Sequence, residues 1–236
     1  MNTKLTTVLM FLTICLAAAG SVVGQDPGKP WKEWSKKEAE KVLNDSPWAQ
    51  LQIDMDFMET SPLTRPRDPS TTNRLKQGEG LTYGIRFFSA RPVRQAFVRM
   101  IQLQQKNLSP EVVERMNGFA EKASKDSIVI AVTIEGPDSN ILGKAMGVVW
   151  NASTPTLKPS TYLERNDGKR LFLEEYVPPG KDGFGARFIF PRSLDGKPFL
   201  TTDHSIVRFV SDLGSSMNFH MTFKVKDMML NGNLEY

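Results

Sequence analysis

The chain has 236 residues, of which 40% are hydrophobic, 24% charged and 9% aromatic, values close to those of an ordinary globular protein. This composition excludes a collagen, a coiled coil and a wholly disordered chain. The 30 Lys and Arg residues outnumber the 26 Asp and Glu residues by a net charge of +4, which is too small for this length to require a nucleic-acid partner.

The first 24 residues have the pattern of a secretory signal peptide. Lys4 is the only charged residue among them, and an apolar run over residues 5–20 follows it. The run contains threonines and is shorter than the roughly 20 consecutive apolar residues that span a bilayer, so we expect export with cleavage and no transmembrane segment in the mature protein. Cleavage after Ala19 and cleavage after Gly24 both fit, and the polar residues that follow favour Gly24.

The only cysteine, Cys15, lies within this predicted signal peptide. Ile14 precedes it where a lipoprotein signal has a small residue, so lipid anchoring through Cys15 is not expected. Cleavage would remove the only thiol, and with it disulfides, a cysteine nucleophile and thiolate metal ligands. We therefore expect an exported protein, periplasmic or extracellular, that is stabilised by its apolar core.

Residues 25–32 form a polar leader, and residues 33–236 are predicted to form one α+β domain. Ser35 and Glu38 have the spacing of a capping box and predict a short helix, which Pro47 brings to an end. From residue 48 the apolar period changes to two, which predicts a half-buried strand. Its apolar face is expected to consist of Leu51, Ile53, Met55 and Phe57.

Residues 61–80 carry three prolines and no apolar period, so we expect a long surface loop there. A strand over residues 81–87 follows. Pro92 and Ser109-Pro110-Glu111 then mark the starts of two helices, which are predicted to form a hairpin. Residues 140–150 fit either a strand or a helix that glycines interrupt.

In the C-terminal half, Asp-Gly and Asn-Gly pairs separate strand-like runs, a pattern typical of tight hairpins. These runs cover residues 170–176, 186–190, 205–210 and 219–225, and a further strand is expected over residues 128–134. The sequence therefore predicts an antiparallel sheet or sandwich with the short helix and the helical hairpin packed on it.

Four segments carry a resemblance: Trp31-Lys32-Glu33-Trp34-Ser35, Ser46-Pro47-Trp48-Ala49, residues 185–192 and residues 231–236. In them the chain resembles a family of uncharacterised secreted bacterial proteins, over most of the mature chain. The resemblance implies export from a bacterium. Because that family has no assigned activity, it implies no functional residues here.

Two groups of residues are candidates for binding. Trp31, Trp34 and Trp48 lie among lysines and could stack on sugar rings, although clamping the short helix onto the sheet is the favoured interpretation. Arg65 and Arg67 belong to a series of arginines in the long loop and the first long helix. Such a series either binds anionic polymers or forms a solvated charged face.

Catalytic candidates are weaker. Asp54 and Asp56 are predicted to share one strand face about 6 to 7 Å apart, a separation that a glycosidase pair allows but that any solvated strand also shows. The histidines His204 and His220, with Asp203 beside the first, do not complete a metal site, so we expect no metal and no cofactor.

The sequence is compatible with two functions. The favoured hypothesis is a non-catalytic envelope or extracellular module that binds a protein or a glycan. The alternative is a hydrolase that acts on a saccharide or a similar polymer through paired carboxylates.

Overall fold

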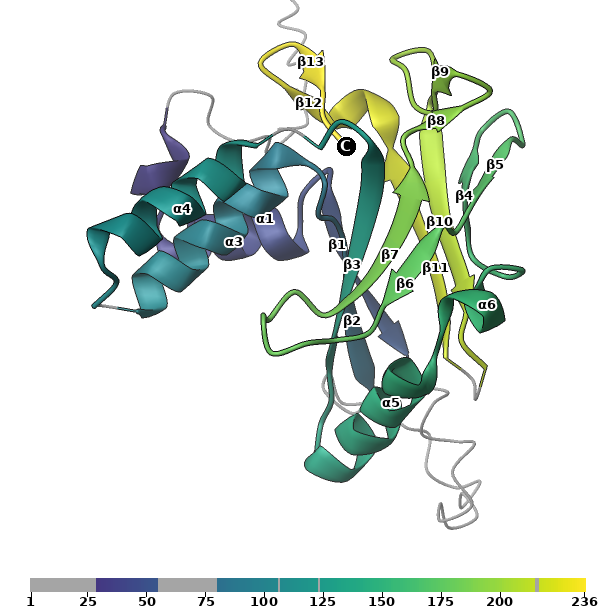
Figure 1. Ribbon diagram of the computed structural model, residues 1–236, viewed down its shortest axis with the longest axis horizontal. Coiled ribbons are helices and arrows are strands. Elements are labelled where there is room, and N and C mark those ends of the chain that lie inside the picture. The colour runs from purple at the N-terminus through teal and green to yellow at the C-terminus, as the bar shows by residue number, and fades with distance from the viewer. Residues whose placement is uncertain (1–28, 55–79, 106, 123, 215–216) are drawn as a thin grey trace, which may run out of the picture.

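The computed structural model describes residues 29–54, 80–105, 107–122, 124–214 and 217–236. The predicted signal peptide, Asp56, Arg65, Arg67 and nearly all of the predicted long loop lie outside these residues. Within them, two antiparallel sheets pack face to face, and helices lie beside them (Figure 1). The predicted α+β fold with antiparallel sheets is confirmed.

Five strands form the larger sheet, called sheet A here. Their order is β1 (Ala49–Asp54), β2 (Leu81–Phe87), β3 (Ser127–Glu135), β7 (Ala186–Pro191) and β6 (Glu175–Val177), and all neighbours are antiparallel. Successive side chains of a strand point to opposite faces. Each strand of sheet A therefore has one face toward the other sheet and one face away from it, which we call the outer face.

Four strands form the smaller sheet, sheet B, in the order β11 (Asn218–Lys224), β10 (Ile206–Asp212), β4 (Tyr162–Arg165) and β5 (Arg170–Phe172). Two short hairpins lie outside these sheets. One pairs β8 (Ser193–Leu194) with β9 (Lys197–Pro198), and the other pairs β12 (Met229–Leu230) with β13 (Asn233–Leu234).

The single strand predicted over residues 170–176 is wrong. This run forms β5 and β6, which belong to different sheets. Between them, the backbone amide of Leu173 donates to the carbonyl of Thr161, the residue before β4 of sheet B, and that of Glu174 donates to the carbonyl of Ile189 in sheet A. The chain therefore crosses from one sheet to the other within two residues.

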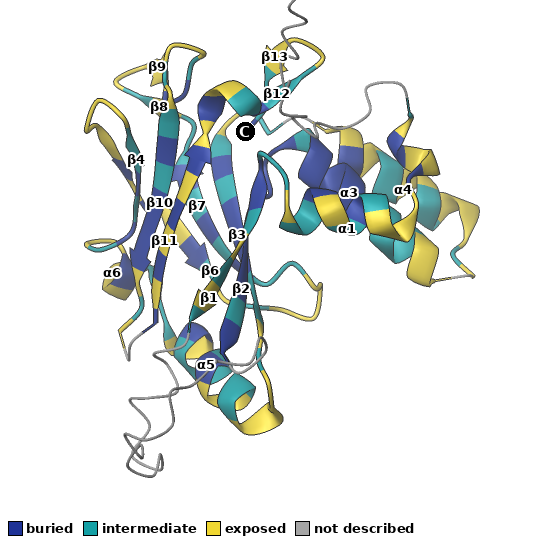
Figure 2. Cartoon of the chain, turned by 180° about the vertical axis from the view of Figure 1, so that it is seen from behind, coloured by how far each residue is buried: buried dark blue, intermediate teal, exposed yellow. Residues whose placement is uncertain are grey.

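Aromatic side chains from the two sheets interlock in the core. Ring centroids lie 4.9 Å apart for Tyr83 and Phe219, 4.8 Å for Phe87 and Phe223, and 5.2 Å for Phe188 and Phe209, all in edge-to-face geometry. Edge-to-face contacts add to the stabilisation from apolar burial. Figure 2 shows the resulting alternation, with buried and exposed residues following one another along β11.

Polar side chains of β1 close one side of the sandwich. The Gln52 side chain donates to the carbonyl of Asn218 (2.7 Å) and accepts from the amide of His220 (3.0 Å), and Gln50 donates to the carbonyl of Thr222 (3.1 Å). The side-chain amides of Gln50 and Gln52 thus satisfy backbone hydrogen-bonding groups at the edge of β11, as a further strand would. The expectation that Leu51 and Ile53 face the core is therefore wrong, because they are 47% and 61% exposed. Met55 and Phe57, which were assigned to the same face, lie outside the described residues.

The N-terminal helices form a second apolar cluster on the outer side of sheet A. It contains η1 (Trp31–Glu33), α1 (Lys36–Asn44), α3 (Arg91–Gln104) and α4 (Pro110–Glu121). Ser35 caps α1, with its hydroxyl accepting from the Glu38 amide and the Glu38 carboxylate accepting from the Ser35 amide, so the predicted capping box is confirmed. The predicted hairpin of α3 and α4 is also confirmed.

The ambiguous residues 140–150 form a helix, α5 (Ser139–Asn151), at the other end of the strands (Figure 1). The Asp138 carboxylate caps it by accepting from the amides of Asn140 and Ile141. Two short elements complete the structure, α6 (Thr154–Leu157) and η2 (Val225–Asp227). Among the described residues, no helix combines the length and apolar character that a membrane span requires.

Candidate functional site

The three clustered tryptophans are buried. Trp31, Trp34 and Trp48 are 8%, 7% and 2% exposed. The indole Nε1 of Trp31 donates to the Glu121 carboxylate of α4 (2.7 Å), and that of Trp48 donates to the carbonyl of Glu235 (2.8 Å). Their rings hold the helices and the C-terminal residues against the sandwich, so they do not offer a surface for stacking sugar rings.

The arginines of α3 do not form a solvated charged face. Arg91 pairs with the Glu235 carboxylate at 2.5 Å, and Nε of Arg99 donates to the carbonyl of Trp34 at 2.6 Å. Arg94 is 4% exposed. The arginines that the sequence grouped on this helix therefore make contacts with other segments of the chain.

The catalytic and metal candidates are not brought together. The Asp54 carboxylate accepts a hydrogen bond from the hydroxyl of Tyr83 at 3.0 Å. Nδ1 of His204 accepts from the amide of Thr201 at 2.9 Å, whereas His220 is exposed on β11. Among the described residues, no three His, Cys, Asp or Glu side chains form a group that could hold a metal ion.

A cleft of about 410 Å³, the arginine cleft, lies between sheet A and the helices. Its floor comes from the outer face of β3, β6 and β7, and its walls come from the turn after β2, the first turns of α3 and the segment that ends α4. The residues that line it are Phe88, Ser89, Arg94, Phe119, Lys122, Ser124, Val129, Val177, Arg187 and Ile189.

Strand alternation places the floor residues. Phe188 points into the core, so Arg187 and Ile189 on either side of it point to the outer face. Val177 is the register partner of Arg187, and Val129 is the partner of Ile189. Two neighbouring strand pairs thus bring one cation and three apolar side chains onto the same patch of sheet.

Arg94 brings a buried positive charge to this cleft. Its guanidinium donates through Nη1 to the carbonyls of Ser89 and Phe88 and through Nη2 to the carbonyl of Lys122. Its Nε is buried and has no acceptor among the described residues. Burial lowers the pKa of Arg94, and the carboxylates of Glu235 and Glu121 partly oppose this. Since a guanidinium stays protonated in proteins, the charge persists while its hydrogen-bond acceptors are neutral carbonyls.

Arg187 provides a second cation. Its Nη1 lies 3.3 Å from the Asp182 carboxylate, and its guanidinium lies 5.6 Å from the ring centroid of Phe184. Like Arg94, it has a buried Nε without an acceptor in the described part of the chain. Lys122, which is exposed at the rim, adds a third positive charge.

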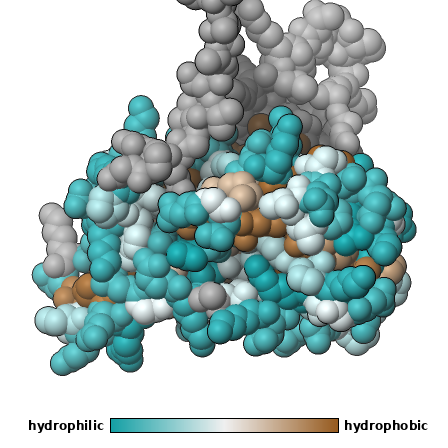
Figure 3. Space-filling view, turned by 90° about the horizontal axis from the view of Figure 1, so that it is seen from above, coloured by the Kyte–Doolittle hydropathy of each residue, from teal (hydrophilic) through white to brown (hydrophobic). Residues whose placement is uncertain are grey.

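Four phenylalanine rings stand beside the cleft. Phe184 lies 4.7 Å from Phe88, 4.7 Å from Phe97 and 5.9 Å from Phe119, measured between ring centroids. A second hollow of about 350 Å³, the phenylalanine groove, begins on their other side. It is lined by Phe97, Val98, Ile101, Val112, Arg115, Met116, Phe119 and Phe184. At the helical end of the molecule, on the left of Figure 3, apolar atoms reach the surface between hydrophilic ones.

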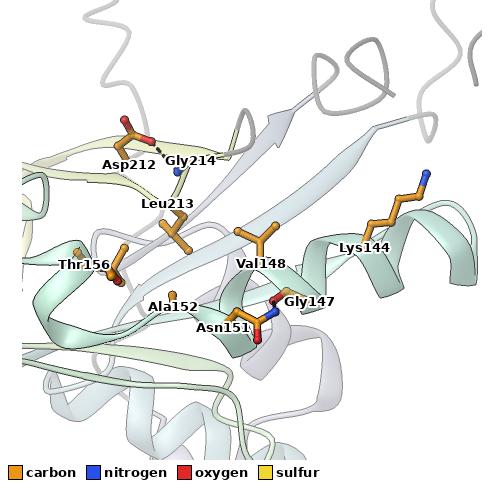
Figure 4. Close-up of a pocket in the computed structure, with 10 residues that line it drawn as sticks. Lys144, Gly147, Val148, Asn151, Ala152, Thr156, Asp212, Leu213 and Gly214 are labelled. Atoms are coloured by element: carbon orange, nitrogen blue, oxygen red, sulfur yellow. Dashed lines mark hydrogen bonds between the residues drawn. The ribbon is translucent and has the colours of Figure 1, made fainter. Parts of the chain in front are cut away.

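A third hollow, of about 610 Å³, lies between α5, α6 and the end of β10 (Figure 4). Its polar groups serve local structure. The Asp212 carboxylate accepts from the amide of Gly214 (2.8 Å), and the Asn151 side chain donates to the carbonyl of Gly147 (2.9 Å). Lys144 extends away from the other side chains drawn. A site typically combines apolar walls with a few converging polar groups, and the arginine cleft fits that description better.

The sequence did not indicate the arginine cleft, because its residues come from separate segments of the chain. Two signals were nevertheless present. Arg187 interrupts an otherwise apolar strand, and Phe184 stands between Gly183 and Gly185 in the loop before it. Both glycines have positive φ angles, +77° and +79°, so this loop has a defined shape that places the Phe184 ring over the cleft edge.

Comparisons with protein-family models, with curated proteins and with solved structures found no match to this chain.

Proposed function

We propose that this chain is an exported, non-catalytic binding module, and that its arginine cleft binds a small anionic ligand. The proposal keeps the non-catalytic binding role that the sequence favoured, and it replaces the expected protein or glycan with a small anion. The observation that carries it is Arg94, a guanidinium that is 4% exposed, lines the cleft and donates to neutral carbonyls.

The buried charge of Arg94 requires compensation. A buried cation is costly unless an anion or several good hydrogen bonds compensate for it. For Arg94, three carbonyls and the carboxylates of Glu235 and Glu121 supply part of the compensation. Asp182 pairs with Arg187. Even so, each of the two arginines keeps an Nε without an acceptor among the described residues. Guanidinium groups suit carboxylate and similar planar anions, since they offer paired donors in a fixed geometry.

Binding of 8-anilinonaphthalene-1-sulfonate, an apolar monoanion that fluoresces when it is bound, tests the proposal. We expect one saturable site on the purified protein. Arg187→Gln should weaken binding on the order of tenfold to a hundredfold, the usual effect of losing a charge-assisted hydrogen bond.

Arg208→Gln is the matched control for this experiment. Arg208 lies on β10 of sheet B, 2.9 Å from Glu164, so the substitution removes the same charge away from the cleft. Equal weakening by the two substitutions would show a non-specific effect of charge. That result, or the absence of a saturable site, would overturn the proposal.

Export is tested separately by the mass of the protein recovered from its native host. Support comes from the signal-peptide pattern of residues 1–24 and from the resemblance to secreted bacterial proteins. We expect a mature chain that begins at Gln25. Recovery of a chain that retains Met1 inside the cell would contradict export.

The hydrolase alternative gains no support from the described residues. Asp54 is hydrogen-bonded to Tyr83, and its predicted partner Asp56 lies outside them. The buried hydroxyl of Tyr83 has a raised pKa, because burial and the Asp54 carboxylate both disfavour its ionisation. Tyr83 therefore remains a hydrogen-bond donor to Asp54.

A further inference from the structure

The arginine cleft and the phenylalanine groove share a wall. Phe119 lines both hollows, and its ring lies 5.9 Å from Phe88 on the cleft side and 5.9 Å from Phe184 on the groove side. One hollow carries two arginines and a lysine, whereas every residue that lines the other is apolar except Arg115. A charged hollow and an apolar hollow therefore adjoin on two sides of the Phe119 ring.

The apolar compartment is built by the helical hairpin. Val112, Met116 and Phe119 are spaced by four and three residues along α4, so they lie on one helix face. Phe97 and Ile101 form the corresponding pair on α3. Figure 2 shows α4 as the more exposed of the two helices, and Phe119 is 37% exposed.

We propose that the ligand is a free unbranched fatty acid, with its carboxylate at Arg94 and Arg187 and its acyl chain across Phe119 in the phenylalanine groove. This inference rests on the proposed function of the cleft. A slender chain suits two hollows that are separated by one ring, whereas a rigid ring system of the same volume requires a single wide hollow.

Charge selects a monoanion. The carboxylates of Glu121 and Glu235 act on Arg94, and Asp182 lies 3.3 Å from Arg187. With Lys122, three cations thus stand near three carboxylates. Each further negative charge on a ligand adds repulsion from Asp182, so a dianionic phosphate is disfavoured relative to a monocarboxylate at this site.

Calorimetric titration with butanoate, octanoate, decanoate and dodecanoate tests the inference on the purified protein. Once the chain passes Phe119, each added methylene should strengthen binding about fourfold, because burying a methylene is favourable by a nearly constant amount. Dodecanol, which has the chain without the charge, should bind at least tenfold more weakly than dodecanoate.

Two substitutions test where the acyl chain of the ligand lies. Met116→Asp places a charge in the groove and should abolish the dependence on chain length, while binding of 8-anilinonaphthalene-1-sulfonate in the cleft persists. Val112→Asp is a second variant with the same expected result, should Met116→Asp fail to fold by circular dichroism. Leu103→Asp is the matched control, because Leu103 is 37% exposed on α3 and does not line the groove.

The outcomes separate the two proposals. Binding of the sulfonate without any chain-length dependence overturns the fatty-acid inference and leaves the anion site intact. Failure of every anion to bind overturns both. Tighter binding of decyl phosphate than of decanoate overturns the assignment of a monocarboxylate, and an effect of Leu103→Asp equal to that of Met116→Asp overturns the location of the chain.

Discussion

Truncation of Trp48 should destabilise the protein strongly. The side chain is 2% exposed, belongs to the main core and donates from Nε1 to the carbonyl of Glu235 at 2.8 Å. Removing a buried aromatic side chain costs about 3 to 5 kcal/mol through lost burial and the cavity left behind. For a domain of this size each kcal/mol lowers the melting temperature by about 2 to 4 °C, so Trp48→Ala should lower it by about 6 to 20 °C.

Urea unfolding followed by far-ultraviolet circular dichroism measures the free energy of unfolding of each variant, and a thermal scan gives its melting temperature. Trp48→Phe keeps an aromatic ring but removes the hydrogen bond, and should fall between the wild type and Trp48→Ala. Trp150→Ala removes the same side chain from α5, where Trp150 is 59% exposed and donates to the carbonyl of Pro179 at 3.3 Å. It should destabilise the protein clearly less than Trp48→Ala, because less buried apolar surface is lost. If Trp48→Ala and Trp150→Ala lose similar stability, the structural role assigned to Trp48 is refuted.

Four further predictions concern local structure. Ser35→Ala should cost about 1 kcal/mol of unfolding free energy by removing the cap of α1. Hydrogen bonds from Ser35, with an ion pair to Lys29, lower the pKa of Glu38 from 4.5 to about 2. The stability that Glu38 adds relative to Glu38→Gln should therefore be complete above pH 4.5 and disappear as the pH falls through about 2, and a pH-independent difference would contradict this. Gly185→Ala should lower the free energy of unfolding in urea more than Gly168→Ala does. Both glycines have φ near +80°, which costs an L-residue about 1 to 2 kcal/mol. Only at Gly185 would the added Cβ also lie 2.2 Å from the carbonyl oxygen of Val132. Ser211→Ala should lower the free energy of unfolding by about 1 to 3 kcal/mol, because it leaves the buried Thr161 hydroxyl without its 2.7 Å partner. The double variant with Thr161→Val should lose less than the sum of the two single variants. Strict additivity would show that the pair is not coupled.

Local sequence signals were sufficient for most elements of the fold. The capping box at Ser35, the prolines at the starts of α3 and α4, and the strict alternation along β11 each act over a few residues, and the structure contains all of these elements. Residues 140–150 remained ambiguous because glycines weaken the helical signal, although the Asp138 cap settles the start of α5.

The tertiary structure decided which face of each element is buried and where the candidate site lies. Alternation along β1 suggested that Leu51 and Ile53 face the core, yet the unpaired edge of β11 draws Gln50 and Gln52 inward instead. Likewise, Arg94 belongs to the arginine series for which the sequence offered anion binding or a solvated face, and it is buried against carbonyls of two other segments.

Hydrophobic period and turn chemistry are properties of neighbouring residues, so the sequence by itself determined most of the elements and their antiparallel arrangement. The arginine cleft depends on contacts between residues far apart in the chain, such as Arg94 with Lys122 and Phe88 with Phe184. Whether a charged side chain meets solvent, a carbonyl or a carboxylate is decided only when these segments pack together. For that reason the burial of Arg94 and the half-burial of Arg187, which define the candidate site, could be seen only in the tertiary structure.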